Sequence, residues 1–314
     1  MPELDDPLAD CTCCPRNCHA ARSQGRLGYC RSGAGISVGS ICVHRGEEPV
    51  IGGKNGICNV FFTRCNLQCV YCQNFQISRN TGDIVEHKLS LAEVVSRITR
   101  ILDCAVTSVG FVSPSHVIPQ MKSIIHGLSE RKPNPTFIFN TNAYDKVETI
   151  RSLEGMTDVY LPDLKYMSAD LAARFSDARN YPEVATAAIK EMFRQKGPDI
   201  LLDAEGIVRS GLIIRHLVLP GQIENSRRCL RWIAEELSPS VHVSLLAQYR
   251  PTSLVANHPH LGRALRKDEY DAVLEEMEAL GFERGWTQEL SSSDSYRPDF
   301  AQSHPFEHLH GRDK

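Results

Sequence analysis

The chain has 314 residues, of which 42% are hydrophobic, enough for one large globular domain or a domain with a small appendage. Its formal net charge is −3, and charged residues of both signs are interspersed along the chain. This argues against strong electrostatic binding to nucleic acid or anionic lipid. The first residues lack the basic start and apolar run of a signal peptide, and no run reaches the roughly 18 apolar residues of a membrane span. We therefore expect a cytoplasmic protein without a membrane partner.

Residues 1–50 are rich in Cys, Gly, Arg and Ser and show no sustained period, which is typical of a loop-rich segment held by a metal. From residue 56 onward, β-rich runs alternate with helical patterns. Strands are predicted at residues 57–62, 105–112, 136–140, 158–164, 211–219 and 241–249. Helices are predicted at residues 90–102, 116–130, 182–195, 224–237 and 268–280, the first of them opened by a capping-box pattern of Ser90 and Glu93.

This alternation predicts a parallel sheet with helices outside it. A closed eight-unit barrel typically needs about 250 residues, whereas six units fit this length, so we predict a partial, open (β/α)6 TIM-like barrel. The predicted organisation is a Cys-rich metal-binding segment over residues 1–50, the barrel over 51–290 and a polar tail over 291–314. The tail contains His304, His308 and His310, and is either a flexible or loosely docked terminus or a metal-binding segment.

The twelve cysteines are unevenly distributed, and in a long chain without an export signal clustered thiols hold metal more often than they form disulfides. One group near the start consists of Cys11, Cys13, Cys14, Cys18 and Cys30, and a second consists of Cys65, Cys69 and Cys72. The scattered cysteines are predicted to be small buried apolar residues: Cys42, Cys58, Cys104 and Cys229.

The second group follows the first predicted strand and reads CNLQCVYC. An iron–sulfur cube is coordinatively complete with four thiolates, so three thiolates leave one iron open to chelate the amino and carboxylate groups of a substrate. A zinc site completed by a distant fourth ligand, or three buried thiols without metal, are the alternatives.

The stretch CNLQCVYCQN resembles the CxxxCxφC signature (φ aromatic) of the radical S-adenosylmethionine (SAM) superfamily. Together with CTCCPRNCHAARSQGRLGYC, FVSPSHVIPQ, FNTNAYDKVETI, DVYLPDLKYMS, YPEVATAAIKEMFRQ, IIRHLVLPG and LLAQYRP, it resembles the PflX-type family, relatives of pyruvate formate-lyase activating enzyme, over residues 11–290. The resemblance implies a 4Fe–4S cluster on Cys65, Cys69 and Cys72, with SAM on the open iron. Electron transfer to SAM would then cleave it to a 5′-deoxyadenosyl radical that abstracts hydrogen.

The resemblance also implies partners. An external one-electron reductant, such as flavodoxin or ferredoxin, would be needed, and the substrate suggested by the activating enzymes is a glycine α-hydrogen of a partner protein. Radical modification of RNA or of a small molecule is an alternative, although the mild acidity of the chain disfavours nucleic acid. A non-enzymatic iron–sulfur electron carrier is another, but a carrier needs no open iron and no polar groups at a barrel mouth.

Two residues of the cysteine loop are assigned to the cofactor by the resemblance. Tyr71 would lie beside the cluster and the adenine, or is an ordinary core aromatic residue. Asn74 matches an asparagine that follows the cluster loop in activating enzymes, or caps the backbone.

Charged residues within predicted strands are the next candidates. Asp163 and Lys165 lie two residues apart in LPDLK and so share one face of a strand, where the resemblance implies that they bind the ammonium and the carboxylate of the methionine moiety. A simple interior ion pair is the alternative. Arg215 in IIRHLVLPG is expected to meet a carboxylate or ligand, or to pair with Asp163 or another neighbour.

Polar residues after the second and third strands complete the candidates. Ser113 and Ser115 stand in SPSH, where many superfamily members have a Gly-Gly-Glu motif that receives the SAM amine, so the partner of the amine stays open here. Asn140 and Thr141 are expected to reach the ribose hydroxyls, or to cap a turn.

The N-terminal thiols Cys11, Cys14, Cys18 and Cys30 can close a zinc site or a fully ligated iron–sulfur cluster, and such a cluster would be structural or an electron relay. Cys13 can replace either neighbour. Four arginines in this segment either offset thiolate charge or form a solvated basic face: Arg16, Arg22, Arg26 and Arg31.

Overall fold

The computed structural model describes residues 6–131, 134–294 and 298–306, so His308 and His310 of the predicted tail fall outside the described residues. In the described residues, ten strands form one mostly parallel sheet in the order β10-β9-β8-β6-β5-β4-β2-β1-β3, with β7 paired to β8. Its end strands β10 and β3 do not pair with each other. The sheet is therefore open, which confirms the predicted partial barrel.

All six predicted strands are present, and consecutive ones lie side by side in parallel. They are β2 (Ile57–Phe62), β4 (Ser108–Val112), β5 (Thr136–Thr141), β6 (Val159–Pro162), β8 (Val208–Leu217) and β9 (His242–Leu246). Every residue of β2, β4 and β6 is buried. Both faces of these strands are thus covered, which explains why they read as continuous apolar runs in the sequence.

Four strands were not predicted: β1 (Ile36–His44), β3 (His87–Leu89), β7 (Leu201–Leu202) and β10 (Gly285–Thr287). The longest, β1, lies within the Cys-rich segment and pairs antiparallel with β2. A Cβ atom on Gly39 in its middle would lie 2.5 Å from Cγ2 of Ile77. The small residues that obscured β1 in the sequence therefore allow another segment to pack closely against it.

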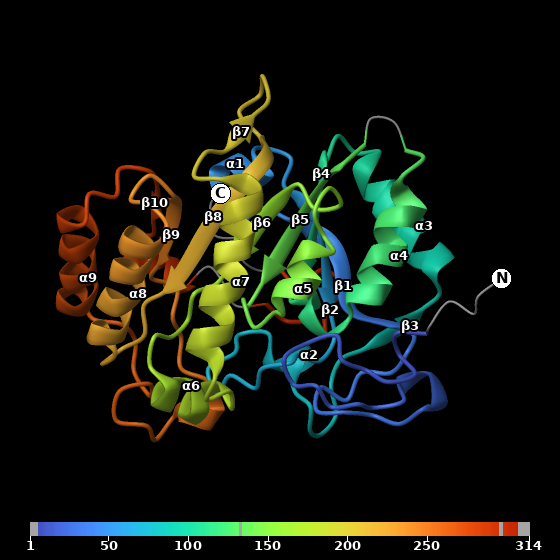
Figure 1. Ribbon diagram of the computed structural model, residues 1–314, viewed down its shortest axis with the longest axis horizontal. Coiled ribbons are helices and arrows are strands. Elements are labelled where there is room, and N and C mark those ends of the chain that lie inside the picture. The colour runs from blue at the N-terminus through green and yellow to red at the C-terminus, as the bar shows by residue number, and fades with distance from the viewer. Residues whose placement is uncertain (1–5, 132–133, 295–297, 307–314) are drawn as a thin grey trace.

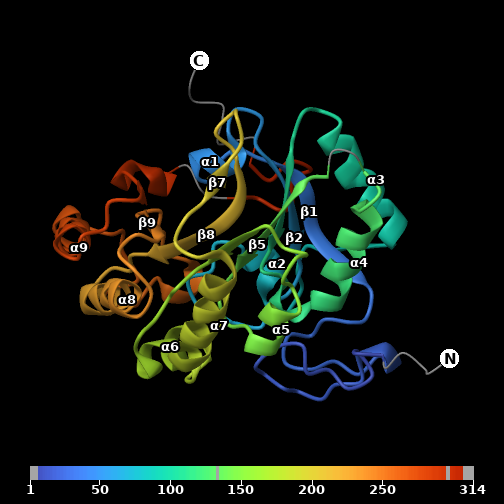
Figure 2. The same cartoon turned by 45° about the horizontal axis from the view of Figure 1, so that its top comes forward.

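The five predicted helices are also present: α3 (Leu91–Leu102), α4 (Ile118–Leu128), α7 (Tyr181–Lys196), α8 (Ile223–Glu236) and α9 (Lys267–Ala279). Figures 1 and 2 show them along the outer side of the sheet. The capping box of α3 is confirmed, because Ser90 Oγ accepts from the amide of Glu93 at 3.3 Å and the Glu93 carboxylate accepts from the amide of Ser90 at 2.8 Å. No helix in the described part of the chain is both long and apolar enough to span a bilayer.

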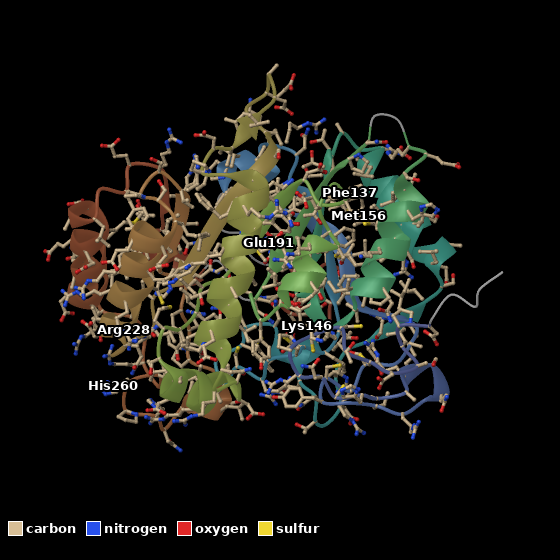
Figure 3. All side chains as sticks on the ribbon, in the orientation of Figure 1. Phe137, Lys146, Met156, Glu191, Arg228 and His260 are labelled. Atoms are coloured by element: carbon tan, nitrogen blue, oxygen red, sulfur yellow. The ribbon has the colours of Figure 1, made fainter. Side chains whose placement is uncertain are left out.

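Shorter helices connect these elements. They are α1 (Pro49–Gly52), α2 (Phe75–Ser78), α5 (Val147–Arg151) and α6 (Ala169–Ser176), with 3-10 turns at Arg22–Gln24, Pro114–His116, Ser253–Val255 and Leu290–Asp294. Glu191, labelled on α7 in Figure 3, accepts from Arg194 Nη2 at 2.8 Å and lies 3.5 Å from Arg151 Nε of α5. This ion network ties α5 to α7.

Residues 298–306 of the tail pack against β1, β2, α2 and the end of β4. Phe300 and Phe306 are buried in one apolar cluster with Cys42, Phe61, Ile77 and Val112. The ring of Phe300 lies 5.3 Å from that of Phe61. The amide of Phe300 also donates to Gln76 Oε1 of α2 at 2.8 Å. Residues 298–306 are thus held by apolar packing and by a hydrogen bond.

Three of the scattered cysteines, Cys42, Cys58 and Cys229, are buried as predicted. Cys104 is exposed, so the prediction was wrong for this residue. It lies just beyond the end of α3, past Leu102, the last residue of that helix that is buried.

Replacing Phe300 by alanine should release the tail from the barrel. Removing a buried aromatic ring costs about 3–5 kcal/mol, more than a short docked segment can lose without detaching. Limited proteolysis under native conditions should show faster cleavage within residues 291–306, whereas Leu254→Ala, at a side chain that is 61% exposed, should leave the pattern unchanged. An unchanged cleavage rate in Phe300→Ala would contradict the docking of this segment.

Candidate functional site

The segment between β2 and α2, residues 63–74, carries three cysteines and is called the thiol loop below. These are Cys65, Cys69 and Cys72. Two hydrogen bonds from the loop reach the end of α6: the amide of Gln68 donates to the carbonyl of Ser176 at 3.3 Å, and that of Val70 to the carbonyl of Phe175 at 2.8 Å. The loop is therefore held by an element more than 100 residues away in the chain.

One cavity of about 470 Å³ lies between the thiol loop and the strands. The cysteines of the thiol loop line it. Seven of the nine residues that sequence analysis offered for the cofactor line it as well: Tyr71, Asn74, Ser113, Asn140, Asp163, Lys165 and Arg215. Ser115 and Thr141 do not line it, and the individual roles of the seven remain predictions.

Each thiol of the loop meets a polar side chain that the sequence analysis did not single out. Asn142 Nδ2 donates to Cys65 Sγ at 3.3 Å, and Ser176 Oγ donates to Cys69 Sγ at 3.0 Å. Cys72 Sγ and Ser78 Oγ lie 3.2 Å apart. Such side chains stabilise a thiolate and orient it, as hydrogen-bonding partners of metal ligands do. Asn142 alone had a sequence signal, because it lies two residues after Asn140.

Asp163 and Lys165 form an ion pair inside the cavity, with Lys165 Nζ 2.6 Å from Asp163 Oδ2. Burial alone would lower the pKa of Lys165, but the charges of Asp163 and then Cys69 outweigh it and raise that pKa above its usual value. The ammonium therefore stays charged beside the thiols, where it can attract a carboxylate.

Tyr181 of α7 fixes the backbone on which this pair sits. Its hydroxyl donates to the carbonyl of Asp163 at 2.6 Å and accepts from the amide of Lys165 at 3.0 Å. The tyrosine thereby replaces sheet hydrogen bonds just past the end of β6. Both side chains consequently face the cavity from a defined position.

Arg215 of β8 has two carboxylate partners, Glu47 and Glu48, from the loop between β1 and α1. Arg215 Nε donates to Glu48 Oε1 at 2.8 Å. Burial raises the pKa of Glu47, but Arg215 and then His44 outweigh it, and that pKa falls to about 2. The predicted carboxylate partner of Arg215 is thus supplied by the chain itself, from glutamates that the sequence analysis missed because they follow an unpredicted strand.

The residues after β4 and β5 divide into two groups. Ser113 and Asn140 line the cavity and contact each other, since the amide of Ser113 donates to the carbonyl of Asn140 at 2.8 Å. Ser115 and Thr141 instead form a buried network, with their hydroxyls 3.0 Å apart and the hydroxyl of Thr141 donating to Asp145 at 2.5 Å. Thr141 also accepts from the amide of Ala143, so for this residue the turn-capping alternative holds.

Tyr71 and Asn74, the two cofactor candidates of the thiol loop, differ in their contacts. Tyr71 is buried, and its hydroxyl lies 2.5 Å from that of Tyr166. Asn74 precedes α2 but makes no cap hydrogen bond through its side chain, which lines the cavity. The side chain of Asn74 therefore does not perform the capping role that the sequence left open.

The donor set fits the predicted cluster. Burial raises the pKa of the Cys65 thiol to about 12 and that of Cys69 to about 11, so a bound metal charge is what would keep them as thiolates. Among the described residues, no three His, Cys, Asp or Glu side chains are placed to hold one metal ion. A cube makes a different demand, since each thiolate binds its own iron.

The N-terminal thiols lie outside this cavity. Cys11, Cys14 and Cys30 are buried and Cys18 is half-buried. Burial, together with the charges of Cys30, Cys11 and Cys18, raises the pKa of Cys14 to about 12, so the predicted ligands are near one another. The chain is also tight at Gly28, where a Cβ would lie 2.2 Å from Cys18 Sγ.

The arginines of this segment do not form one basic face. Arg22 is buried, and its Nη1 lies 3.6 Å from Cys11 Sγ and donates to the carbonyl of His116 at 2.7 Å. Arg26 and Arg31 are exposed. Arg22 therefore offsets thiolate charge, as one prediction had it, while Arg26 and Arg31 are solvated.

Arg16 joins the N-terminal segment to the thiol loop. Its Nε donates to the carbonyl of Asn66 at 2.9 Å, and its guanidinium lies 3.7 Å from the ring centroid of Tyr29 and 5.2 Å from that of Tyr144. Figure 1 shows the segment, in blue, near the end of the sheet toward which the arrowheads of β5 and β8 point. The two groups of cysteines are thus carried by segments in direct contact.

Comparison with known proteins places the chain among relatives. No family model matches it. It is 30% identical over 271 residues to "Uncharacterized protein MJ0674" of Methanocaldococcus jannaschii, covering 85% of this chain and 73% of the relative. HydG, a maturase of the [FeFe]-hydrogenase, has a similar fold, with a TM-score of 0.50 and 12% identity over 71% of this chain and 49% of HydG. A domain of pyruvate-formate lyase-activating enzyme from Bacteroides vulgatus matches at a TM-score of 0.39 and 14% identity, over 55% of this chain and 93% of that domain.

Removing the charge of Arg215 should destabilise the fold. Arg215→Met leaves Glu47 and Glu48 buried without the guanidinium that contacts both, and breaking a buried ion pair in this way costs about 3–5 kcal/mol. Adding Glu47→Gln and Glu48→Gln to the same chain should restore most of the loss, because no uncompensated charge remains. Denaturant unfolding followed by circular dichroism measures both changes. Equal stability of Arg215→Met and the unaltered chain would show that the three side chains do not depend on one another.

Proposed function

This chain belongs to the same family as MJ0674 of Methanocaldococcus jannaschii and has the fold of the radical SAM enzymes, and on that premise we propose that it is an enzyme that cleaves SAM reductively. In this proposal Cys65, Cys69 and Cys72 hold a 4Fe–4S cluster, and SAM occupies the cavity beside them. The observation that supports it most directly is that one cavity is lined both by three thiols from one loop and by the ion pair of Asp163 and Lys165.

The chemistry would come from the cofactors: when bound, they supply one electron and a 5′-deoxyadenosyl radical that abstracts a hydrogen atom. The chain's own groups bind and orient. Lys165, charged and only 14% exposed, would receive the carboxylate of the methionine moiety, and Asp163 its ammonium. Asn140 would offer a polar group to the ribose, and Ser113 lines the cavity at the position where many superfamily members have the motif that receives the SAM amine.

Part of the cavity wall is apolar. Phe61, Leu217 and Leu246 line it from the strands, and Phe306 of the docked tail packs in the same apolar cluster as Phe61 and also lines it. Apolar groups beside the reacting atoms would limit side reactions of a radical. A cavity of this kind beside the thiols favours an enzyme over an electron carrier, whose cluster needs no substrate cavity.

For the substrate, we propose a glycine α-hydrogen of a partner protein, on the sequence resemblance to the activating enzymes. A one-electron reductant such as flavodoxin or ferredoxin would supply the electron. The readout for a candidate partner is deuterium transfer from its α-deuterated glycine into 5′-deoxyadenosine, accompanied by a glycyl radical signal in electron paramagnetic resonance. Deuterium transfer from RNA or from a small molecule instead would replace this part of the proposal.

The activity can be tested anaerobically with the protein reconstituted with iron and sulfide, reduced and mixed with SAM. We expect SAM to shift the paramagnetic resonance signal of the cluster and 5′-deoxyadenosine to form. Cys69→Ala should abolish both effects because one iron loses its ligand, whereas Cys104→Ala, at an exposed thiol, should retain both. Lys165→Ala should assemble the cluster but lose the response to SAM. A cluster that forms in the unaltered chain and ignores SAM would leave the carrier as the better description.

We further propose that Cys11, Cys14, Cys18 and Cys30 hold a second metal centre, either an iron–sulfur cluster, in which each thiolate binds its own iron, or zinc, which would require the four thiols to move closer together than they lie in the structure. Replacing Cys65, Cys69 and Cys72 together by alanine should remove the first cluster and leave this centre in place. Elemental analysis of that variant should therefore still find zinc, or iron with sulfide, and the additional change Cys14→Ser should lower that content. A triple variant free of both metals would refute the second centre.

A further inference from the structure

We propose that the hydroxyls of Tyr71, Tyr166 and Ser176 form a directed hydrogen-bond chain that ends on the Cys69 thiolate and raises the reduction potential of the cluster held there. This inference rests on the proposed function, since it concerns the cluster of the thiol loop. The role proposed for Tyr71, Tyr166 and Ser176, control of the reduction potential, follows neither from the cysteine motif nor from the residues that line the cavity.

The three hydroxyls follow one another at hydrogen-bond distance. Tyr71 OH lies 2.5 Å from Tyr166 OH, which lies 2.8 Å from Ser176 Oγ. Ser176 Oγ lies 3.0 Å from Cys69 Sγ. The residues come from three separate segments, namely the thiol loop, the chain just after β6 and the last position of α6.

All three residues are buried, with exposed fractions of 5% for Tyr71 and 0% for Tyr166 and Ser176. Their hydroxyls are therefore satisfied by one another and by the sulfur rather than by bulk water. In a medium of low dielectric constant, hydrogen bonds in a chain polarise one another, so each donor strengthens the next bond.

The sulfur sets the direction of the chain. A thiolate has lone pairs and no proton, so Ser176 must donate to Cys69 when that residue ligates iron. Ser176 Oγ can then accept from Tyr166, and Tyr166 in turn can accept from Tyr71. The polarisation thus runs from the tyrosine of the CVYC motif to a cysteine of the same motif, through two residues outside it.

The effect on the cluster follows from charge. Reduction adds negative charge to the cluster, and hydrogen bonds to its sulfur ligands stabilise that charge. The donor that touches the sulfur contributes most, and hydroxyls farther along contribute less because they act only through polarisation. A graded set of shifts is therefore the signature that distinguishes this chain from three independent structural hydroxyls.

The experiment is a redox titration of the anaerobically reconstituted full chain, followed by electron paramagnetic resonance of the signal that is lost in Cys69→Ala. We expect the midpoint potential to become more negative in Ser176→Ala, less so in Tyr166→Phe and least in Tyr71→Phe. Ser176→Thr keeps a hydroxyl and should titrate close to the unaltered chain.

Tyr249→Phe is the matched control. This tyrosine is also fully buried and its ring centroid lies 6.1 Å from that of Tyr71, but its hydroxyl donates to the carbonyl of Leu261. Its removal should leave the potential unchanged. A shift as large as that of Tyr166→Phe would mean that loosened packing, and not the hydroxyl chain, changes the potential.

Equal potentials in the unaltered chain, Ser176→Ala and Tyr166→Phe would overturn the proposal. If Ser176→Ala fails to fold, Tyr166→Phe and Ser176→Thr decide alone, since the first should shift the potential and the second should not. Failure of the unaltered chain to assemble any cluster would instead reject the proposed function, so the two failures are distinguishable.

Discussion

The interior of this open barrel contains buried charged side chains, and each needs a partner of opposite charge close by. This requirement determines how the site is arranged. Arg215 projects from β8 into the cavity and is neutralised by Glu47 and Glu48, which enter from the loop after β1. Lys165 and Asp163 compensate each other nearer the thiols. Because leaving any of these charges unpaired would cost several kcal/mol, β1, α1 and the central strands hold a mutually dependent arrangement.

The thiol loop is likewise held in place by groups from several separate elements. Its backbone is held by α6, its carbonyl at Asn66 by Arg16, and its thiols by Asn142, Ser176 and Ser78. These supports come from regions distributed over more than 150 residues. A site held by several rigid elements would lose little entropy on binding the proposed cofactor.

The sequence predicted those parts of the molecule that depend on local pattern. Buried strands such as Ile57–Phe62 read as apolar runs, and the Ser90 capping box is visible in four residues. β1 escaped because Gly39 and its small neighbours serve close packing against Ile77, which no period reveals. Glu47, Glu48 and Ser176 escaped because their partners lie about 100 residues or more away, and only the folded chain shows the pairing.

The placement of the N-terminal segment suggests why two groups of thiols belong to one chain. Arg16 lies against Tyr29 and Tyr144 and donates to the carbonyl of Asn66, the residue next to Cys65, so a change in the fold of residues 11–30 would reach the thiol loop through this side chain. Arg22, in the same segment, contacts the thiol of Cys11 and also donates to the carbonyl of His116 in the turn after β4. It therefore links the N-terminal thiols to the end of that strand. A metal that orders residues 11–30 would thereby also order the chain after β2 and the chain after β4, which border the cavity. Support of the site is therefore a sufficient role for the N-terminal segment, whether or not it also transfers electrons.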